Sequence, residues 1–304
     1  MANKKAGGLS RKTRWVIGGI FWYTLMGLLA ILMVYPLIFS VFGGFNTNTE
    51  FSEMGELLPI PESPTLANFK FAFGRTMSHP LLNSFLRSTW YTLLVTSMSI
   101  LMGYVLARYE FRGKKFMLGF IIVTQVVPSV MTMIPTFVMV ARLPFLGGND
   151  FLGRGGHGLY NNQAILFLPL GWGYLIWTFL FTQSMKSLPV AFEEAAEIDG
   201  CGFFKTLTQV VLPMQKPIIT VIAVNVALGT WNDWMTPFLY INDIQKSTLT
   251  AYMATLTASL KQYGSKDYPK IFALATIAII PPFAIFLYFQ KYIIQGIASA
   301  GVKE

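Results

Sequence analysis

An acidic stretch, EEAAEIDGCGFFKTLTQVVLP, occupies residues 193–213 and holds four of the fourteen acidic residues of the chain. Long apolar segments lie on both sides of it. A carboxylate such as Glu194 can pair with an arginine or lysine of another protein, and the small Ala195 and Ala196 would let that partner approach the backbone closely. Gly200 permits a sharp turn that larger residues would strain. These residue types indicate docking chemistry, with an ordinary surface helix in a loop as the alternative.

A second polar group lies inside an apolar segment, where ionisable residues are costly and mark functional sites by default. It consists of Asn225, Trp231, Asn232 and Asp233. Amides and carboxylates bind sugar hydroxyls and aromatic faces stack on sugar rings, so these residues are candidates for the path of a carbohydrate. Two alternatives stay open. Asn232 and Asp233 could cap or bridge helices or hold a partner protein, and the tryptophans could form a belt at the membrane interface.

The composition argues against other chemistries. Cys201 is the single cysteine, which excludes an intrachain disulfide and a multi-cysteine metal site. His79 and His157 are too few and too far apart for a zinc site built on paired histidines. The net charge is +9, yet the basic residues are scattered between apolar segments and resemble no nucleic-acid-binding module. We expect no catalytic residue, no metal site and no nucleic-acid partner.

The elements that position these residues are membrane helices. Hydrophobic residues make up 54% of the chain and charged residues 12%, against about 25% charged residues in a soluble domain. A helix needs about 20 apolar residues to cross the hydrocarbon core, and helices are expected because backbone groups in lipid must be satisfied within the segment. Six segments are long enough, namely 15–42, 88–107, 116–140, 164–185, 218–240 and 271–290.

Lysine and arginine residues in the loops predict the orientation. The N-terminus, the second and fourth loops and the C-terminal tail together carry fourteen of them, and the external loops carry eight. Both termini are therefore expected in the cytoplasm. The predicted parts are a basic N-terminus (1–14), a six-helix domain (15–294) and a C-terminal tail (295–304). The domain includes an external loop (43–80), with little regular structure beyond one short helix near 63–73, and a cytoplasmic loop (186–217) between helices four and five.

Two short helices are predicted in the cytoplasmic loop. Pro189 and two early glutamates favour the start of a helix over 190–199, and Gly200 favours its end. Ala191, Ala195 and Ile198 would share one face of this helix. A second helix is predicted over 202–212, ended by Pro213 and Pro217. The apolar face of the second helix would consist of Phe203, Leu207, Val210 and Val211.

Prolines inside the apolar segments predict kinks, which moving gates often need. Pro128 and Pro135 lie in the third segment, and Pro281 and Pro282 lie in the sixth. Static irregularity in packing is the alternative.

The cytoplasmic loop carries a recognisable pattern. Glu194-Ala195-Ala196, then Gly200, then Val210, Leu212 and Pro213 at fixed spacing resemble the EAA loop of bacterial ABC importer permeases, with Val210 in place of the usual isoleucine. The six segments, the loop between segments four and five, the motif WNDWMTPF and the ending GIASAGVKE extend the similarity over nearly the whole chain. In these features the chain resembles the MalG-type permeases of carbohydrate importers.

The resemblance implies an all-α integral membrane fold of the MetI-like permease type, and a transporter subunit of the bacterial cell membrane rather than an enzyme. In that family the EAA helix docks into a cleft of a cytosolic ATPase, and the C-terminal tail can also reach toward the ATPases. The implied partners are a second, MalF-like permease, two copies of the ATPase, an extracytoplasmic solute-binding protein, membrane lipid and a carbohydrate, with an oligosaccharide as the expected substrate. The implied coupling residues are Glu194, Ala195, Ala196, Gly200, Leu212 and Pro213.

No Walker A motif occurs in the sequence. No cofactor is therefore expected in this chain, and ATP and magnesium would be bound by the partner ATPases.

Three rival hypotheses remain. An importer permease for a non-sugar solute would share the EAA loop. An ion-coupled secondary transporter would use Asp233 as its ion site and would show internal repeats and several intramembrane acids, whereas the six segments contain one acid and no visible repeat. A membrane scaffold that uses the loop only for docking would not need polar residues inside the fifth segment.

Overall fold

The computed structural model describes residues 11–53, 57–169, 174–263 and 267–301. All regular structure in these ranges is helical, which agrees with the predicted all-α class. Three helices are long and apolar enough to cross a membrane, namely Gly18–Gly44, Met77–Arg108 and Tyr268–Lys291, and two sharply bent helix pairs raise the number to as many as five. Six continuous membrane helices are therefore not confirmed.

The chain divides into two compact units, and the smaller one comprises Met1–Phe71 and Lys266–Thr276. It contains α1 (Arg11–Gly44) and the beginning of α14 (Tyr268–Gly301). Aromatic packing joins these helices, because the ring centroid of Phe272 in α14 lies 5.4 Å from that of Phe39 in α1.

The loop 43–80, predicted to be external, contains more helix than expected. It contains α2 (Asn48–Glu53) and α3 (Ala67–Ala72), of which α3 falls in the expected place. The buried Asn68 donates its amide to the carbonyls of Gly44 and Asn46, at 3.0 and 2.8 Å, and so replaces regular backbone pairing. The expectation of little regular structure up to residue 80 is wrong, because α4 already begins at Arg75.

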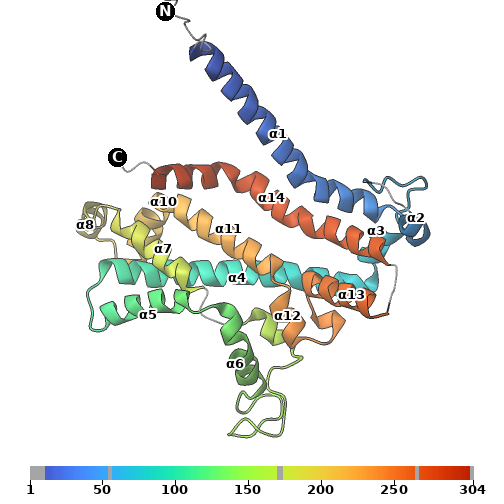
Figure 1. Cartoon of the computed structure of the whole chain (residues 1–304). Coiled ribbons are helices and arrows are strands. Elements are labelled where there is room, and N and C mark those ends of the chain that lie inside the picture. Colours follow the sequence, from blue (N-terminus) through green and yellow to red (C-terminus); the bar gives the residue numbers. More distant parts are fainter. Residues whose placement is uncertain (1–10, 54–56, 170–173, 264–266, 302–304) are drawn as a thin grey trace, which may run out of the picture. The chain divides into compact units, whose positions relative to one another are not determined.

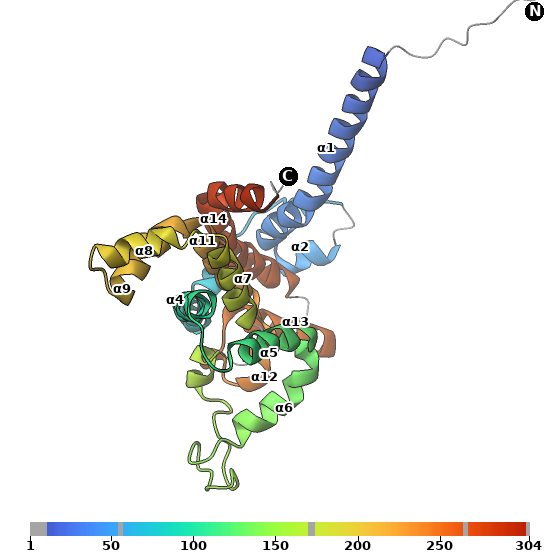
Figure 2. The ribbon, with the colours of Figure 1, turned by 90° about the vertical axis from the view of Figure 1, so that its left-hand side faces the viewer.

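The larger unit, Ala72–Ser265 and Ile277–Glu304, is built around α4 (Arg75–Arg108). Helices α7 (Leu175–Lys186) and α11 (Lys216–Asn232) lie along it (Figures 1 and 2). The buried core between these helices and the loop 186–217 consists of Tyr91, Val95, Tyr104, Phe181, Met185, Leu207, Val211, Ile222 and Val226.

A proline divides the third predicted segment into two helices. α5 (Lys114–Val126) and α6 (Ser129–Ala141) meet at a sharp bend, where Val127 has an extended backbone with ψ of 114°. Proline disfavours the helical conformation in the residue before it, so Pro128 accounts for the break. The kink predicted at Pro128 is confirmed. By contrast, Pro135 lies inside α6, and Pro281 and Pro282 lie inside α14 without ending it.

The fourth predicted segment is not one helix. A short 3₁₀ helix, η1 (Gln163–Phe167), is followed by Leu168 and Pro169 outside any helix, and α7 begins only at Leu175. The 12 residues of α7 span about 18 Å, short of the ~30 Å hydrocarbon core. Pro169 has no N–H to continue the 3₁₀ pattern by bonding to the carbonyl of Leu166.

The fifth predicted segment also ends early. α11 stops at Asn232, Asp233 leaves the helical conformation with ψ of 97°, and α12 (Met235–Tyr240) follows. A continuous helix would need an N–H at residue 237 to bond to the carbonyl of Asp233, and Pro237 has none. The expectation that Asp233 lies within a helix is therefore wrong, because Asp233 lies at a helix break.

An unpredicted helix, α13 (Leu249–Tyr263), follows this break, and polar side chains of α4 hold the backbone before it. The Asn83 amide donates to the carbonyls of Gln245 and Ser247 at 3.0 and 2.9 Å. Leu249 N donates to Ser84 Oγ at 2.9 Å, which satisfies a backbone N–H at the start of α13.

The segment 142–162, between α6 and η1, forms a loop that is held by a buried asparagine. Asn149, which is 7% exposed, donates its amide to the carbonyls of Ala141 and Leu143, at 3.0 Å each. Its Oδ1 accepts a hydrogen bond from Gly156 N at 2.9 Å. One side chain thus satisfies three backbone groups that no regular element serves.

Replacing Asn149 with alanine should destabilise this loop, because each buried backbone group left unpaired costs about 1–3 kcal/mol. Limited proteolysis of the detergent-solubilised protein should then show faster cleavage within 142–162. Arg154→Ala is the matched control, because the Arg154 side chain is exposed. Equal resistance of the two variants would contradict the role given to Asn149.

Candidate coupling surface and membrane cavity

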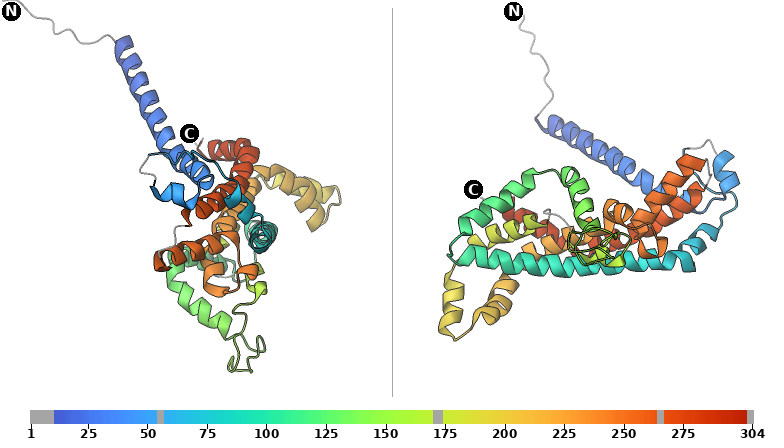
Figure 3. Two further views of the ribbon diagram at one scale, coloured as in Figure 1. Left: turned by 90° about the vertical axis from the view of Figure 1, so that its right-hand side faces the viewer. Right: turned by 90° about the horizontal axis from the view of Figure 1, so that it is seen from below.

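The first predicted loop helix forms as α8 (Ala191–Ile198), and Glu193 fixes it to α4. Arg108 Nε donates to Glu193 Oε1 at 2.6 Å, and the Tyr104 hydroxyl donates to Glu193 Oε2 at 2.9 Å. Arg108 Nη2 also donates to the Leu188 carbonyl at 2.8 Å. Both charged side chains are only 11% exposed, so this is a partly buried ion pair. It joins α8 to the end of a membrane-spanning helix, where Figure 3 shows the loop turning away from α4.

Another face of α8 is accessible. Ile198 is 87% exposed, and Glu194, Ala191 and Ala195 are exposed beside it. Ala196 is buried and faces the rest of the chain. The predicted face of Ala191, Ala195 and Ile198 is therefore present and open to a partner, with Glu194 as its charged member.

A Schellman motif ends α8. Gly200 has a φ of 77°, its N–H donates to the Glu197 carbonyl at 3.0 Å, and Cys201 N donates to the Ala196 carbonyl at 2.9 Å. Glycine adopts this left-handed conformation without strain. A Cβ at Gly200 would meet no atom within 4 Å, so the requirement for glycine is conformational rather than steric.

The second predicted loop helix forms as three joined turns: α9 (Phe203–Thr206), a π-helical turn (Leu207–Val211) and α10 (Leu212–Met214). Leu207 and Val211 of the predicted apolar face are buried in the core, and Leu212 packs against the same cluster. Side chains of the loop therefore touch α4, α7 and α11 at once.

The end of this helix differs from the prediction. Pro213 is exposed and lies inside α10, and the chain turns only at Gln215, where it bends by 85° into α11. The expectation that Pro213 stops the helix is wrong, because the helix continues to Met214. The turn before Pro213 is π-helical, with Leu212 N donating to the Leu207 carbonyl, so the α-helical hydrogen-bond pattern is already interrupted where the proline N–H is missing. Ser184 Oγ of α7 donates to Gln215 Oε1 at 2.6 Å and holds the bend.

At the other end of α11, Asp233 forms an ion pair with a buried arginine of α4. Arg87 Nη2 donates to Asp233 Oδ2 at 2.6 Å, and Arg87 is 2% exposed. Arg87 Nη1 donates to the Asp233 carbonyl at 3.4 Å, as does the Thr250 hydroxyl. Asp233 Oδ1 accepts a hydrogen bond from Thr236 N, in the first turn of α12, at 3.1 Å. The donors on Arg87 and Thr250 satisfy the backbone carbonyl of Asp233, for which Pro237 has no N–H.

Side chains of α4 also donate hydrogen bonds to the backbone carbonyls at the break in the fourth segment. Arg87 Nε donates to the Leu166 carbonyl at 3.1 Å, which is the carbonyl orphaned by Pro169. Trp90 Nε1 donates to the Phe167 carbonyl at 2.9 Å, and the Tyr91 hydroxyl donates to the Leu168 carbonyl. Non-helical backbone at membrane depth is tolerated only where such partners or water satisfy it.

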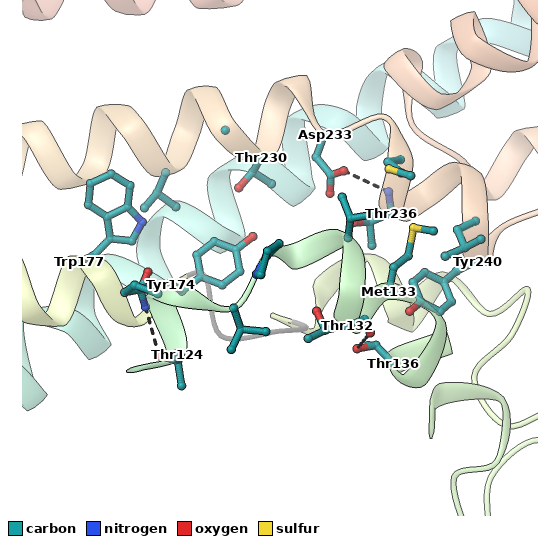
Figure 4. A pocket seen from close by; sticks show the side chains of 18 of the residues that line it. Thr124, Thr132, Met133, Thr136, Tyr174, Trp177, Thr230, Asp233, Thr236 and Tyr240 are labelled. Carbon is teal, nitrogen blue, oxygen red and sulfur yellow. Dashed lines mark hydrogen bonds between the residues drawn. The ribbon is translucent and has the colours of Figure 1, made fainter. Parts of the chain in front are cut away.

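A cavity of about 780 Å³ lies where the broken third and fifth segments meet (Figure 4). This size is within the range of small-molecule sites. Its polar lining comes from α5, α6, α7, α11 and α12 and consists of Thr124, Gln125, Thr132, Thr136, Tyr174, Trp177, Asn225, Thr230, Asp233, Thr236 and Tyr240. Hydroxyl and amide groups thus dominate the polar part of the wall.

The structure separates the four polar residues predicted on the fifth segment. Asn225 and Asp233 line the cavity. Trp231 is buried and donates from Nε1 to the Ala278 carbonyl of α14 at 2.9 Å, so it joins two helices. Asn232 is exposed and does not line the cavity. The helix-bridging alternative, which named Asn232 and Asp233, describes Asp233, although Asp233 also reaches the cavity.

Sequence reasoning missed Glu193, Arg108 and Arg87. The sequence did contain a signal for Arg87. A lone acid in an apolar segment, here Asp233, needs a cation as its partner, and Arg87 directly precedes the apolar segment 88–107. Glu193 and Glu194 are neighbours in sequence, and only the direction of α8 decides which of them faces inward.

The architecture is that of a membrane transport subunit, and the chain belongs to the family of binding-protein-dependent transport system inner membrane components, whose model matches residues 99–299. It is 31% identical over 292 residues to the multiple sugar-binding transport system permease protein MsmG of Streptococcus mutans, with 93% of this chain and 97% of the relative covered. It is 28% identical over 302 residues to the arabinooligosaccharides transport system permease protein AraQ of Halalkalibacterium halodurans, covering 97% and 100% of the two chains.

Solved structures agree on the fold. A chain of a bacterial ABC transporter involved in the import of the acidic polysaccharide alginate superposes with a TM-score of 0.73 at 19% identity, covering 95% of this chain and 100% of that one.

Asp233→Asn should destabilise the larger unit, because a buried charge left without its partner costs about 3–5 kcal/mol. Thermal denaturation in detergent should show this loss, and the loss in the double variant Arg87→Gln/Asp233→Asn should be smaller than the sum of the losses in the two single variants. Asp243→Asn is the control, since the Asp243–Lys246 pair is about 40% exposed and 3.7 Å long. Additive losses in the double variant would argue against a coupled ion pair.

Glu193→Gln and Glu194→Gln should behave differently. Glu193→Gln weakens charge-assisted hydrogen bonds that contribute about 1.5–3 kcal/mol each, so the thermal stability should fall and proteolysis near α8 should accelerate. Glu194→Gln changes an exposed side chain and should leave both measurements unchanged. A reversed order would show that the other glutamate anchors α8.

Proposed function

We propose that this chain is a pore-forming permease subunit of an ATP-driven importer for a carbohydrate, and that the carbohydrate is an oligosaccharide. Family membership supports the transport role. The sugar assignment rests on relatives named for multiple sugars, arabinooligosaccharides and maltodextrin, together with the hydroxyl- and amide-lined cavity. ATP and magnesium would be bound by partner ATPase subunits.

The single observation that carries the coupling role is the accessible face of α8. Glu194 and Ala195 would contact the ATPase, and Gly200 would fix the turn behind them. Ala196 and Leu212 hold the loop to the rest of the chain, and the exposed Pro213 lies on the side of α10 open to a partner.

The 17 residues of α11 supply the route from this surface to the cavity. They span about 26 Å, from the bend at Gln215 to the break at Asp233. In an alternating-access cycle, closing of the ATPase dimer would move α8, the bend would pass the movement to α11, and α11 would shift the cavity wall at Asn225 and Asp233.

The remaining partners follow from the same proposal. A second, MalF-like permease would complete the pore, two copies of the ATPase would bind below it, and an extracytoplasmic binding protein would deliver the sugar. Of the solved relatives, one is an alginate transporter in complex with a pentasaccharide-bound periplasmic protein. We propose that both termini face the cytoplasm, with α14 extending to Gly301 on that side.

Gly200→Leu should uncouple ATP hydrolysis from sugar uptake, because leucine is strained at a φ of 77° and would displace α8. ATPase activity and uptake should be measured together on the complex reconstituted in proteoliposomes. Uptake should fall at least tenfold while ATP hydrolysis continues. Gly202→Leu is the matched control, since Gly202 has a φ of −80° and also has space for a side chain. Normal uptake by Gly200→Leu would refute the coupling role.

A further inference from the structure

The negative charge on the cavity wall is paired with a positive charge that lies outside the cavity. Among the described lining residues, Asp233 is the only one that carries a charge at neutral pH. Its partner Arg87 is 2% exposed and does not line the cavity. A substrate in the cavity therefore meets a carboxylate whose charge is already neutralised, and no cation.

Every nitrogen of the Arg87 guanidinium already donates a hydrogen bond within the protein. Its Nε bonds to the Leu166 carbonyl, its Nη1 to the Asp233 carbonyl and its Nη2 to the Asp233 carboxylate. Its guanidinium also lies 5.1 Å from the ring centroid of Tyr91. Moving Arg87 toward the cavity would leave the Leu166 carbonyl, which Pro169 cannot serve, without its donor and would break the ion pair with Asp233. The Arg87 charge is therefore held by contacts that stabilise the fold.

The rest of the wall offers neutral hydrogen-bonding groups beside aromatic rings. Thr132 and Thr136 project from α6, and Tyr174 and Trp177 from the α7 side (Figure 4). Asn225 of α11 also lines the cavity. Hydroxyls and amides of this kind can replace the water around the hydroxyls of a sugar. They cannot replace the water around a carboxylate at comparable free energy, because a buried anion needs a cation or a set of strong donors.

We infer that the cavity is a binding site for uncharged sugar units, and that Arg87 determines this specificity by neutralising Asp233 from behind the wall. Uronic acids would be disfavoured at this site. The inference rests on the proposed carbohydrate import and assigns a substrate class to this subunit. It also distinguishes this chain from the structural relative described as importing an acidic polysaccharide.

The test is a change of specificity at Asn225, an exposed amide on the cavity wall. Binding of a labelled neutral pentasaccharide (maltopentaose) and of a uronate pentasaccharide (from alginate) is measured on the purified transporter complex without its binding protein. The wild-type complex should bind the neutral sugar at least tenfold more tightly. Asn225→Lys should bind the uronate about tenfold more tightly than wild type, with an affinity that falls as salt rises. Such a gain cannot come from misfolding.

Asn232→Lys is the matched control. It places the same charge seven residues further along the chain, on an exposed residue outside the cavity, so uronate binding should not improve. Equal gains in both lysine variants, no gain in Asn225→Lys, or equal wild-type affinity for the two sugars would overturn the inference. Wild-type binding of neither sugar would overturn it as well. Uptake and coupled ATP hydrolysis by the same preparation would show separately whether the proposed transport function holds.

Discussion

Arg87 is the side chain on which the larger unit depends. Prolines 169 and 237 interrupt two segments that composition marks as membrane spans, and each leaves a carbonyl without its N–H partner. One guanidinium serves both carbonyls and pairs with Asp233. It acts from α4, the longest helix of that unit, whose polar face also holds the start of α13. The breaks are therefore fixed in place, and the cavity between them has a defined wall.

The two ion pairs of α4 hold different parts of the chain at different positions along this helix. Near one end, Arg87 holds the far end of α11, and at the other end Arg108 holds α8 through Glu193. These positions are 21 residues apart, about 32 Å along a helix. Because α11 connects the loop to the cavity wall, α4 provides the frame against which α11 can move.

The predictable part of the fold was the part governed by composition and local pattern. Continuous apolar runs identified α1, α4 and α14, and the glycine, the early glutamates and the apolar spacing located α8 within one residue at each end. The interruptions depend on contacts between segments distant in sequence. Pro169 and Pro237 mark the two interruptions in the sequence. A proline alone does not predict an interruption, because the helix breaks at Pro128 and continues through Pro135. The pairing of Asp233 with Arg87 required a tertiary contact that no short window contains.

The separation of Arg87 and Asp233 in the sequence also concerns how the protein is made. The arginine is synthesised 146 residues before its carboxylate partner, which at ~5–20 residues per second is a delay of roughly 7–30 s. An unpaired arginine is costly in lipid. The segment that becomes α4 must therefore stay near water or in a protein-lined channel until the fifth segment arrives. The placement of α4 in the membrane is then completed only when the fifth predicted segment docks against it.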